Sequence, residues 1–163
     1  MLFFNYLKTC KLYLFKTSIM TILFLCSGAG SCKSLMAKTI LESMDAKPRI
    51  LSSGIRPVKE LHPIATQVMS EIGLSMNLSD LQSLSMLADE SIDYLITFGE
   101  HTKEEFHDLP ISFQHKLHLS FSDPDKPVHP NETSLDAYRR LRDEMSTELD
   151  YFYHRILKEK AAN

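Results

Sequence analysis

The sequence predicts a single-domain α/β protein built on a doubly wound sheet of four parallel strands with helices on both faces. Three observations predict this class. The length of 163 residues suits one domain with its own hydrophobic core. From residue 20 onward, short apolar segments alternate with segments whose apolar residues recur at helical spacing. A glycine-containing loop joins the first predicted strand to the first predicted helix, at the edge where such sheets bind ligands.

The first half of this domain alternates strand and helix. Residues 21–25 (TILFL) form a short apolar run that is typical of a buried parallel strand. Apolar side chains at helical spacing predict a helix over residues 33–45, and residues 50–54 predict a second strand. Pro63 suits the first turn of a second helix, for which Gly73 is a C-terminal cap.

The second half holds two more predicted strands and a long helix. Residues 81–87 are expected to form a short helix, residues 92–98 the third strand and residues 116–121 the fourth. An amphipathic helix then begins at Ser134, with Thr133 or Ser134 as its cap. Its apolar positions are Leu135, Tyr138, Leu141, Met145, Leu149, Phe152 and Ile156.

Residues 1–19 are predicted to be an N-terminal extension, and residues 20–163 the domain. The extension is apolar, but three lysines interrupt it, so it is too broken to span a bilayer and no membrane association is expected. Three interpretations stay open: a stretch upstream of a true start at Met20, a loosely held extension, or a signal peptide.

Charge and cysteine content narrow the function classes. The formal net charge is −3, and the extension carries three lysines and no acidic residue, so the domain carries −6. A net acidic domain argues against nucleic acid as a partner. The three cysteines, Cys10, Cys26 and Cys32, do not form the pattern of a disulfide framework, which favours a reducing, cytoplasmic compartment.

The loop after the first predicted strand carries the chemistry. Gly28 and Gly30 allow the backbone to curl so that successive N–H groups point inward. The following helix adds its N-terminal N–H groups and dipole, and Lys33 adds a full charge, which together make a cradle for a tetrahedral anion. The predicted anion-binding loop consists of Ser27, Gly28, Ala29, Gly30, Ser31 and Cys32. The same field favours a thiolate, so Cys26 is the predicted nucleophile.

Several motifs, in order along residues 20–160, resemble the low-molecular-weight tyrosine phosphatases and the related arsenate reductases. They are ILFLC (22–26), KSLMA (33–37), SSGI (52–55), HPIATQVMSEIGL (62–74), IDYLIT (92–97), Asp123-Pro124 and YRRLRDEM (138–145). The last of these resembles the arsenate reductase branch in particular. The resemblance supports the predicted fold and the start of the domain at Met20.

The resemblance also implies a role for each matching residue. Cys26 would attack phosphorus or arsenic, Lys33 would replace the arginine of the family loop, and Ser34 would hydrogen-bond the thiolate. Asp123 would be the general acid, and Pro124 would help to fix its loop. The implied ligand is a phosphate or arsenate oxyanion, or a phosphorylated substrate. No metal or other cofactor is implied beyond an external thiol reductant for arsenate.

The chain departs from the family pattern at four places. Six residues separate Cys26 from Lys33, where the family has five, and lysine lacks the planar fork of arginine. No resolving cysteine follows the third strand, where residues 98–100 read Phe-Gly-Glu, so Cys32 or an external thiol would serve as redox partner. Residues 125–126, Asp-Lys, stand where many of the phosphatases carry an aromatic pair.

Other interpretations stay open beside this one. The long loop and the lysine are also typical of a degenerate member that binds an anion or a protein partner without turnover. A nucleotide-binding P-loop also uses glycines followed by Lys-Ser, but Cys32 rather than glycine precedes Lys33. The loop also lacks the third glycine that a dinucleotide-binding fingerprint requires. The seven histidines show no zinc-ligand spacing with the cysteines.

Overall fold

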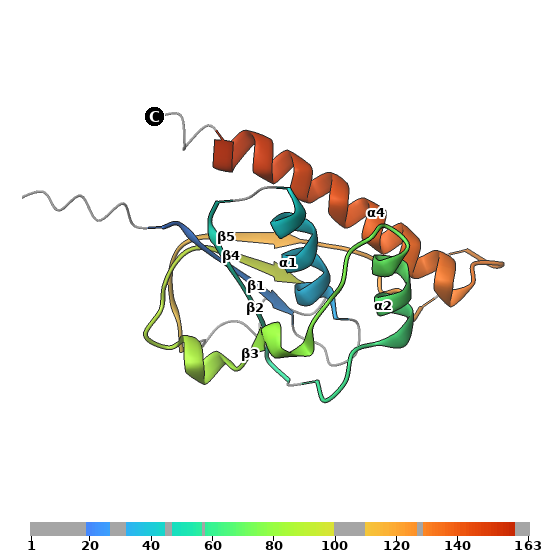
Figure 1. Cartoon of the computed structure of the whole chain (residues 1–163), viewed down its shortest axis with the longest axis horizontal. Helices are drawn as coiled ribbons and strands as arrows, with labels where there is room; N and C mark the ends of the chain where they lie inside the picture. Colours follow the sequence, from blue (N-terminus) through green and yellow to red (C-terminus); the bar gives the residue numbers. More distant parts are fainter. Residues whose placement is uncertain are drawn as a thin grey trace, which may run out of the picture.

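The computed structural model describes residues 19–26, 32–44, 47–56, 58–99, 110–126 and 129–158. Five parallel strands form one sheet in the order β3-β2-β1-β4-β5 (Figure 1). The strands are β1 (Thr21–Cys26), β2 (Arg49–Gly54), β3 (Leu81–Gln82), β4 (Ser91–Phe98) and β5 (Ser112–Leu119). The predicted parallel α/β class is confirmed, with β1 at the centre of the sheet.

The predicted strand number of four is wrong, because a fifth strand, β3, pairs with β2. Ser52 lies opposite Leu81, Ser53 opposite Gln82, and the Ser53 hydroxyl donates to the Gln82 carbonyl oxygen at 2.8 Å. A helix had been expected over residues 81–87. A two-residue strand is too short to show any periodicity in the sequence, and backbone pairing with β2 decides its conformation.

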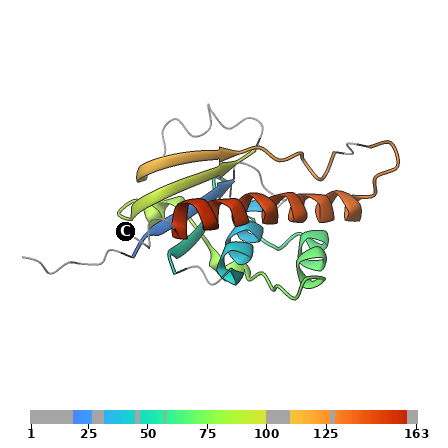
Figure 2. The ribbon, with the colours of Figure 1, turned by 90° about the horizontal axis from the view of Figure 1, so that it is seen from above.

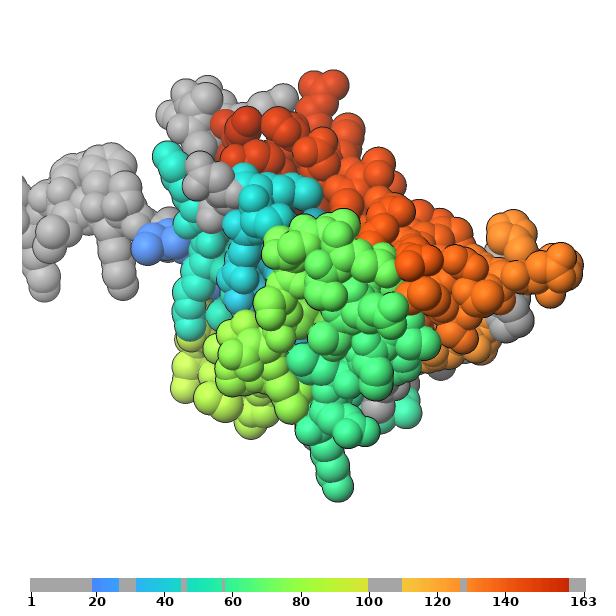
Figure 3. Space-filling view, turned by 45° about the vertical axis from the view of Figure 1, so that its right-hand side comes forward, coloured from blue at the N-terminus to red at the C-terminus, as the bar shows by residue number. Residues whose placement is uncertain are grey.

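The main hydrophobic core lies between one face of the sheet and the α-helices. These helices are α1 (Lys33–Ser43), α2 (Pro63–Ser70) and α4 (Ser134–Phe152). Figure 2 shows all three on the same side of the sheet, and Figure 3 shows α4 running beside α1 and α2. Phe24 and Phe98 of the sheet pack here with Tyr138 and Met145 of α4, and none of these side chains is exposed. Each such side chain contributes on the order of 1.5–3 kcal/mol.

A smaller core lies on the opposite face. Leu23, Leu25 and Leu95 of the sheet pack there against Leu87, which belongs to a 3-10 helix, η2 (Leu84–Leu87). Helices were predicted on both faces of the sheet. Among the described residues, the α-helices lie on one face and this short 3-10 helix lies on the other.

The long helix α4 begins where the sequence predicted. Thr133 is its N-cap, and a capping box joins the side chains and backbone N–H groups of Thr133 and Asp136 in both directions. After Phe152 the helix continues as a π-helical turn, η3 (Tyr153–Leu157). No helix within the described ranges is long and apolar enough to cross a membrane.

The edge strand β5 begins four residues earlier than predicted. Its residues alternate weakly and are mostly exposed, and within the described ranges its one strand partner is β4. The sequence of β5 therefore shows little alternation of apolar and polar residues.

The strand order places the loop after β1 at the topological switch point. The chain proceeds from β1 to β2 and β3 on one side, and then returns to β4 and β5 on the other. The carboxyl end of β1 therefore lies between the outgoing ends of β2 and β4, where doubly wound sheets bind ligands.

Candidate functional site

Cys26 is the last residue of the central strand, and its thiol lies next to the first helix. Its register partners are Gly54 of β2 and Phe98 of β4, and the residue is 7% exposed. The sulfur lies 3.3 Å from the hydroxyl oxygen of Ser34 and 3.8 Å from the carbonyl oxygen of Ser53. The predicted contact between Cys26 and Ser34 is therefore present.

Gly54 makes room for this sulfur. A Cβ atom at residue 54 would lie 3.6 Å from the Cys26 sulfur and 3.2 Å from the carbonyl oxygen of Arg56. Any larger side chain at this position would point into the space in front of the thiol.

Cys32 occupies the turn into α1. Its φ of 53° is left-handed, which is uncommon for a residue other than glycine, asparagine or aspartate. The backbone N–H of His62 donates to the Cys32 sulfur at 3.4 Å. Burial raises the pKa of the Cys32 thiol, the His62 N–H opposes this shift, and the nearby Cys26 sulfur adds to it. At neutral pH Cys32 is therefore a protonated, buried thiol.

Lys33 is the first residue of α1 and is 8% exposed. Within the described ranges, its ammonium group takes part in no hydrogen bond or ion pair. A buried ammonium group is stabilised by an anion or by hydrogen-bond acceptors beside it.

The remaining members of the predicted loop, residues 27–31, lie outside the described residues. Described residues around the Cys26 sulfur line a hollow of about 10 Å³. Its lining includes Cys26, Cys32, Ser34, Leu35, Gly54, Arg56, Val58 and Leu81. This is about the space that one water molecule needs. A tetrahedral oxyanion needs a larger space than this.

Asp123 lies in the turn that follows β5. Its carboxylate accepts a hydrogen bond from the backbone N–H of Asp125 at 3.2 Å and forms an ion pair with Lys126 at 3.5 Å. Asp125 in turn accepts a hydrogen bond from the hydroxyl of Tyr138 at 3.2 Å. Burial, followed by the negative charge of Asp125, strongly raises the pKa of Tyr138, and the charges of Cys32 and Asp123 add to the shift. The tyrosine therefore neighbours both Cys32 and the Asp123 turn.

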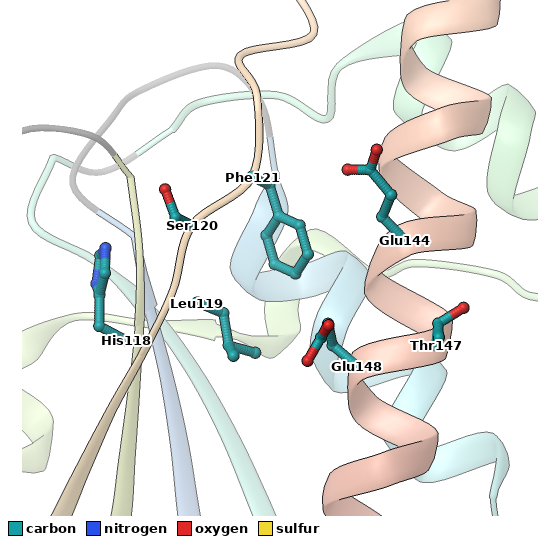
Figure 4. A pocket seen from close by; sticks show the side chains of 7 residues that line it. All are labelled: His118, Leu119, Ser120, Phe121, Glu144, Thr147 and Glu148. Atoms are coloured by element: carbon teal, nitrogen blue, oxygen red, sulfur yellow. The ribbon is translucent and has the colours of Figure 1, made fainter.

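A larger hollow of about 470 Å³ lies behind the segment that leads to Asp123. It is lined by His118, Leu119, Ser120, Phe121, Glu144, Thr147 and Glu148 (Figure 4). Figure 4 shows Leu119 and Phe121 pointing toward α4, with two carboxylates of the helix across the gap. None of the predicted site residues lines it.

The residues that sequence analysis missed are His62, Asp125 and Tyr138. Tyr138 was expected only as one of several apolar residues of the last helix, and its hydroxyl contact depends on a turn 13 residues away. The ring of His62 stacks on that of Tyr138 at 4.7 Å. No group of three or more histidine, cysteine or acidic residues in the described ranges could hold a metal ion.

Comparisons with known proteins agree with this geometry. A model of the low molecular weight phosphotyrosine protein phosphatase family matches residues 21–162. An arsenate reductase from Halalkalibacterium halodurans is 28% identical over 136 residues, which cover 80% of this chain and 93% of that protein.

Two solved structures share the fold. The YwlE arginine phosphatase from Geobacillus stearothermophilus has a TM-score of 0.67 and 20% identity, over 88% of this chain and 97% of its own. An arsenate reductase in the phosphate-binding state has a TM-score of 0.61 and 22% identity, over 84% and 98%. At such identities the structures show a common fold and leave the substrate of this chain open.

Proposed function

Because this chain belongs to the low molecular weight phosphotyrosine protein phosphatase family, which its similarity to an arsenate reductase also supports, we propose that it is a cysteine-dependent enzyme acting on a phosphate or arsenate oxyanion. One observation carries the proposal. The Cys26 thiol lies at the carboxyl end of the central strand, within 3.3 Å of the Ser34 hydroxyl in the first turn of α1. A hydroxyl and a helix N-terminus on one sulfur favour its anionic, nucleophilic form.

The proposed first step is attack of the Cys26 thiolate on phosphorus or arsenic. Lys33 and the backbone N–H groups of residues 27–32 bind the oxyanion, and Ser34 donates to the thiolate before attack. The bond to the leaving oxygen breaks as Asp123 protonates that oxygen. With a phosphate ester, water then attacks the cysteinyl-phosphate, which releases phosphate and restores the thiol.

With arsenate, the second step requires a thiol as reductant. A thiol attacks the sulfur of the cysteinyl-arsenate, two electrons pass to arsenic, and arsenite leaves while a disulfide forms. Cys32 is one candidate for this thiol, and an external thiol is the other. The raised pKa of Cys32 favours the external thiol, because the thiolate is the attacking form. A reducing, cytoplasmic compartment fits this chemistry.

The test combines two assays: hydrolysis of an aryl phosphate, and arsenate reduction coupled to an added thiol. Cys26→Ser should abolish both activities, because serine has no thiolate. Cys32→Ser is the matched control, since it replaces the neighbouring buried thiol, and it should retain aryl-phosphate hydrolysis. If wild-type protein shows neither activity, or if Cys26→Ser is as active as wild type, the proposal is refuted.

A second experiment separates turnover from binding alone. Calorimetry with phosphate, arsenate and sulfate should detect saturable binding to the wild-type protein, and saturable binding without turnover would point to a degenerate member. Lys33→Arg combined with deletion of Ala29 restores the spacing and the guanidinium of the family loop. A gain on the order of 100-fold in kcat is expected from one restored oxyanion contact.

A further inference from the structure

We propose that Tyr138 is a positioning residue for Asp123, which it orients by hydrogen bonding to Asp125 in the same turn. The inference rests on the proposed function, in which Asp123 protonates the leaving oxygen. It assigns a role to a helix residue that does not touch the substrate.

Packing in the core holds the Tyr138 side chain in one position. Its side chain is fully buried on α4, and its ring stacks on that of His62 at 4.7 Å with an interplanar angle of 13°. A buried, stacked ring places its hydroxyl in one position. Burial raises the pKa of this hydroxyl, so it stays a hydrogen-bond donor over the working pH range.

Two hydrogen bonds in sequence connect the hydroxyl to Asp123. Tyr138 donates to Asp125 at 3.2 Å, and the backbone N–H of Asp125 donates to the Asp123 carboxylate at 3.2 Å. The N–H of Lys126 donates to the carbonyl oxygen of Asp123 at 3.0 Å and closes the turn. Fixing the side chain of Asp125 therefore restricts the direction of the Asp123 carboxylate.

Within the described ranges, the bond from Tyr138 is the one side-chain hydrogen bond that joins residues 120–126 to another part of the chain. Phe121 and Pro124 are also buried, and Phe121 packs on Phe98 at 5.8 Å. Apolar contacts set the position of the segment but not the direction of a carboxylate. The hollow of about 470 Å³ between residues 118–121 and α4 further reduces the packing behind it (Figure 4).

The same tyrosine is also close to Cys32. Its stacking partner, His62, donates its backbone N–H to the Cys32 sulfur at 3.4 Å. One side chain thus connects the residue before Lys33 with the turn that carries Asp123. This arrangement holds the turn of the proposed acid in a fixed position relative to the start of α1.

The test compares Tyr138→Phe, which keeps the ring and removes the hydroxyl, with the wild-type protein. Phenyl phosphate needs protonation of its leaving oxygen, whereas p-nitrophenyl phosphate needs it much less. For phenyl phosphate, kcat/KM, which reports the step that releases the leaving oxygen, should fall about 10- to 100-fold, and for p-nitrophenyl phosphate less than about threefold. Asp125→Ala should show the same pattern, while Asp125→Asn, which keeps an acceptor oxygen, should recover part of the loss. Tyr151→Phe, an exposed tyrosine of the same helix, is the control. Equal losses on both substrates, or no loss, would overturn the inference.

Hydrogen exchange tests the tether without any activity. The amides of Asp125 and Lys126 should exchange at least about fivefold faster in Tyr138→Phe, with the amides of β1 and β4 unchanged. Unchanged exchange of these two amides would overturn the inference even in an active enzyme. If the wild type is inactive while exchange responds as expected, the tether is supported and the proposed function alone is refuted.

Discussion

Replacing Ser34 with alanine removes one atom from the contact on which the proposed chemistry depends. The Ser34 hydroxyl oxygen lies 3.3 Å from the Cys26 sulfur, and Ser34 is 1% exposed. Water therefore cannot readily take the place of the lost hydroxyl. Alanine preserves the helix, because it has the highest helix propensity of all residues.

The expected magnitude follows from the charge on the sulfur. A hydrogen bond to an ionised group contributes about 1.5–3 kcal/mol, and one to a neutral group about half of that. We expect the Ser34 hydroxyl to favour the thiolate over the thiol by about 1 kcal/mol, which corresponds to about a fivefold change in the thiolate population.

The assay is alkylation by iodoacetamide at neutral pH, with each cysteine-containing peptide quantified by mass spectrometry. Alkylation of Cys26 should slow about fivefold in Ser34→Ala, because the thiolate is the reacting form. A short cysteine-containing peptide added to the sample is the internal reference. Ser43→Ala, at the other end of α1, is the control, since its hydroxyl donates to the carbonyl oxygen of Ile40. A Cys26 rate within twofold of wild type in Ser34→Ala would refute the reasoning.

Three further predictions concern stability. Arg142 and Arg139 both bind Glu71, but Arg142 is buried and also binds a carbonyl oxygen of α2. Urea denaturation of Arg142→Met should therefore show a loss of about 2 kcal/mol in the free energy of unfolding, and Arg139→Ala a much smaller loss. Equal losses would contradict this. Thr133→Ala removes the capping box of α4 and should cost about 1 kcal/mol, whereas Thr133→Ser should cost little. Hydrogen bonds with Arg139 and Thr133, respectively, lower the pKa values of Glu71 and Asp136 below 4.5 and 3.8. Their stabilisation is complete above these ordinary pKa values and is lost as the pH falls through the lower, folded ones, so Tm should fall between about pH 5 and pH 3. A constant Tm over this range would contradict the last prediction.

Local patterns predicted the central part of the fold. Residues 21–25 are apolar on both sides of the strand, as a strand buried on both faces requires. The cap at Thr133 and the proline at the start of α2 follow from the backbone groups left unbonded at a helix N-terminus. The two edge strands of the sheet were harder to predict, because β5 is mostly exposed and β3 has two residues.

The candidate site also has a part that local sequence patterns predicted and a part that they could not predict. Cys26, Lys33 and Ser34 lie within one short segment, so their spacing on a strand, a loop and a helix could be read directly, and the structure brings the Cys26 sulfur to the Ser34 hydroxyl. The hydrogen bond between Tyr138 and Asp125 could not be read, because it depends on how α4 lies against the turn after β5.

The sequence by itself determined the parallel α/β class, the central strand and the thiol at its end, because each depends on the order of neighbouring residues. Only the tertiary structure decided the fifth strand, the hydrogen bond from the His62 N–H to the Cys32 sulfur, and the contact between the last helix and the Asp123 turn. These contacts join residues far apart in the chain, so packing of the whole core, rather than any local pattern, fixes them.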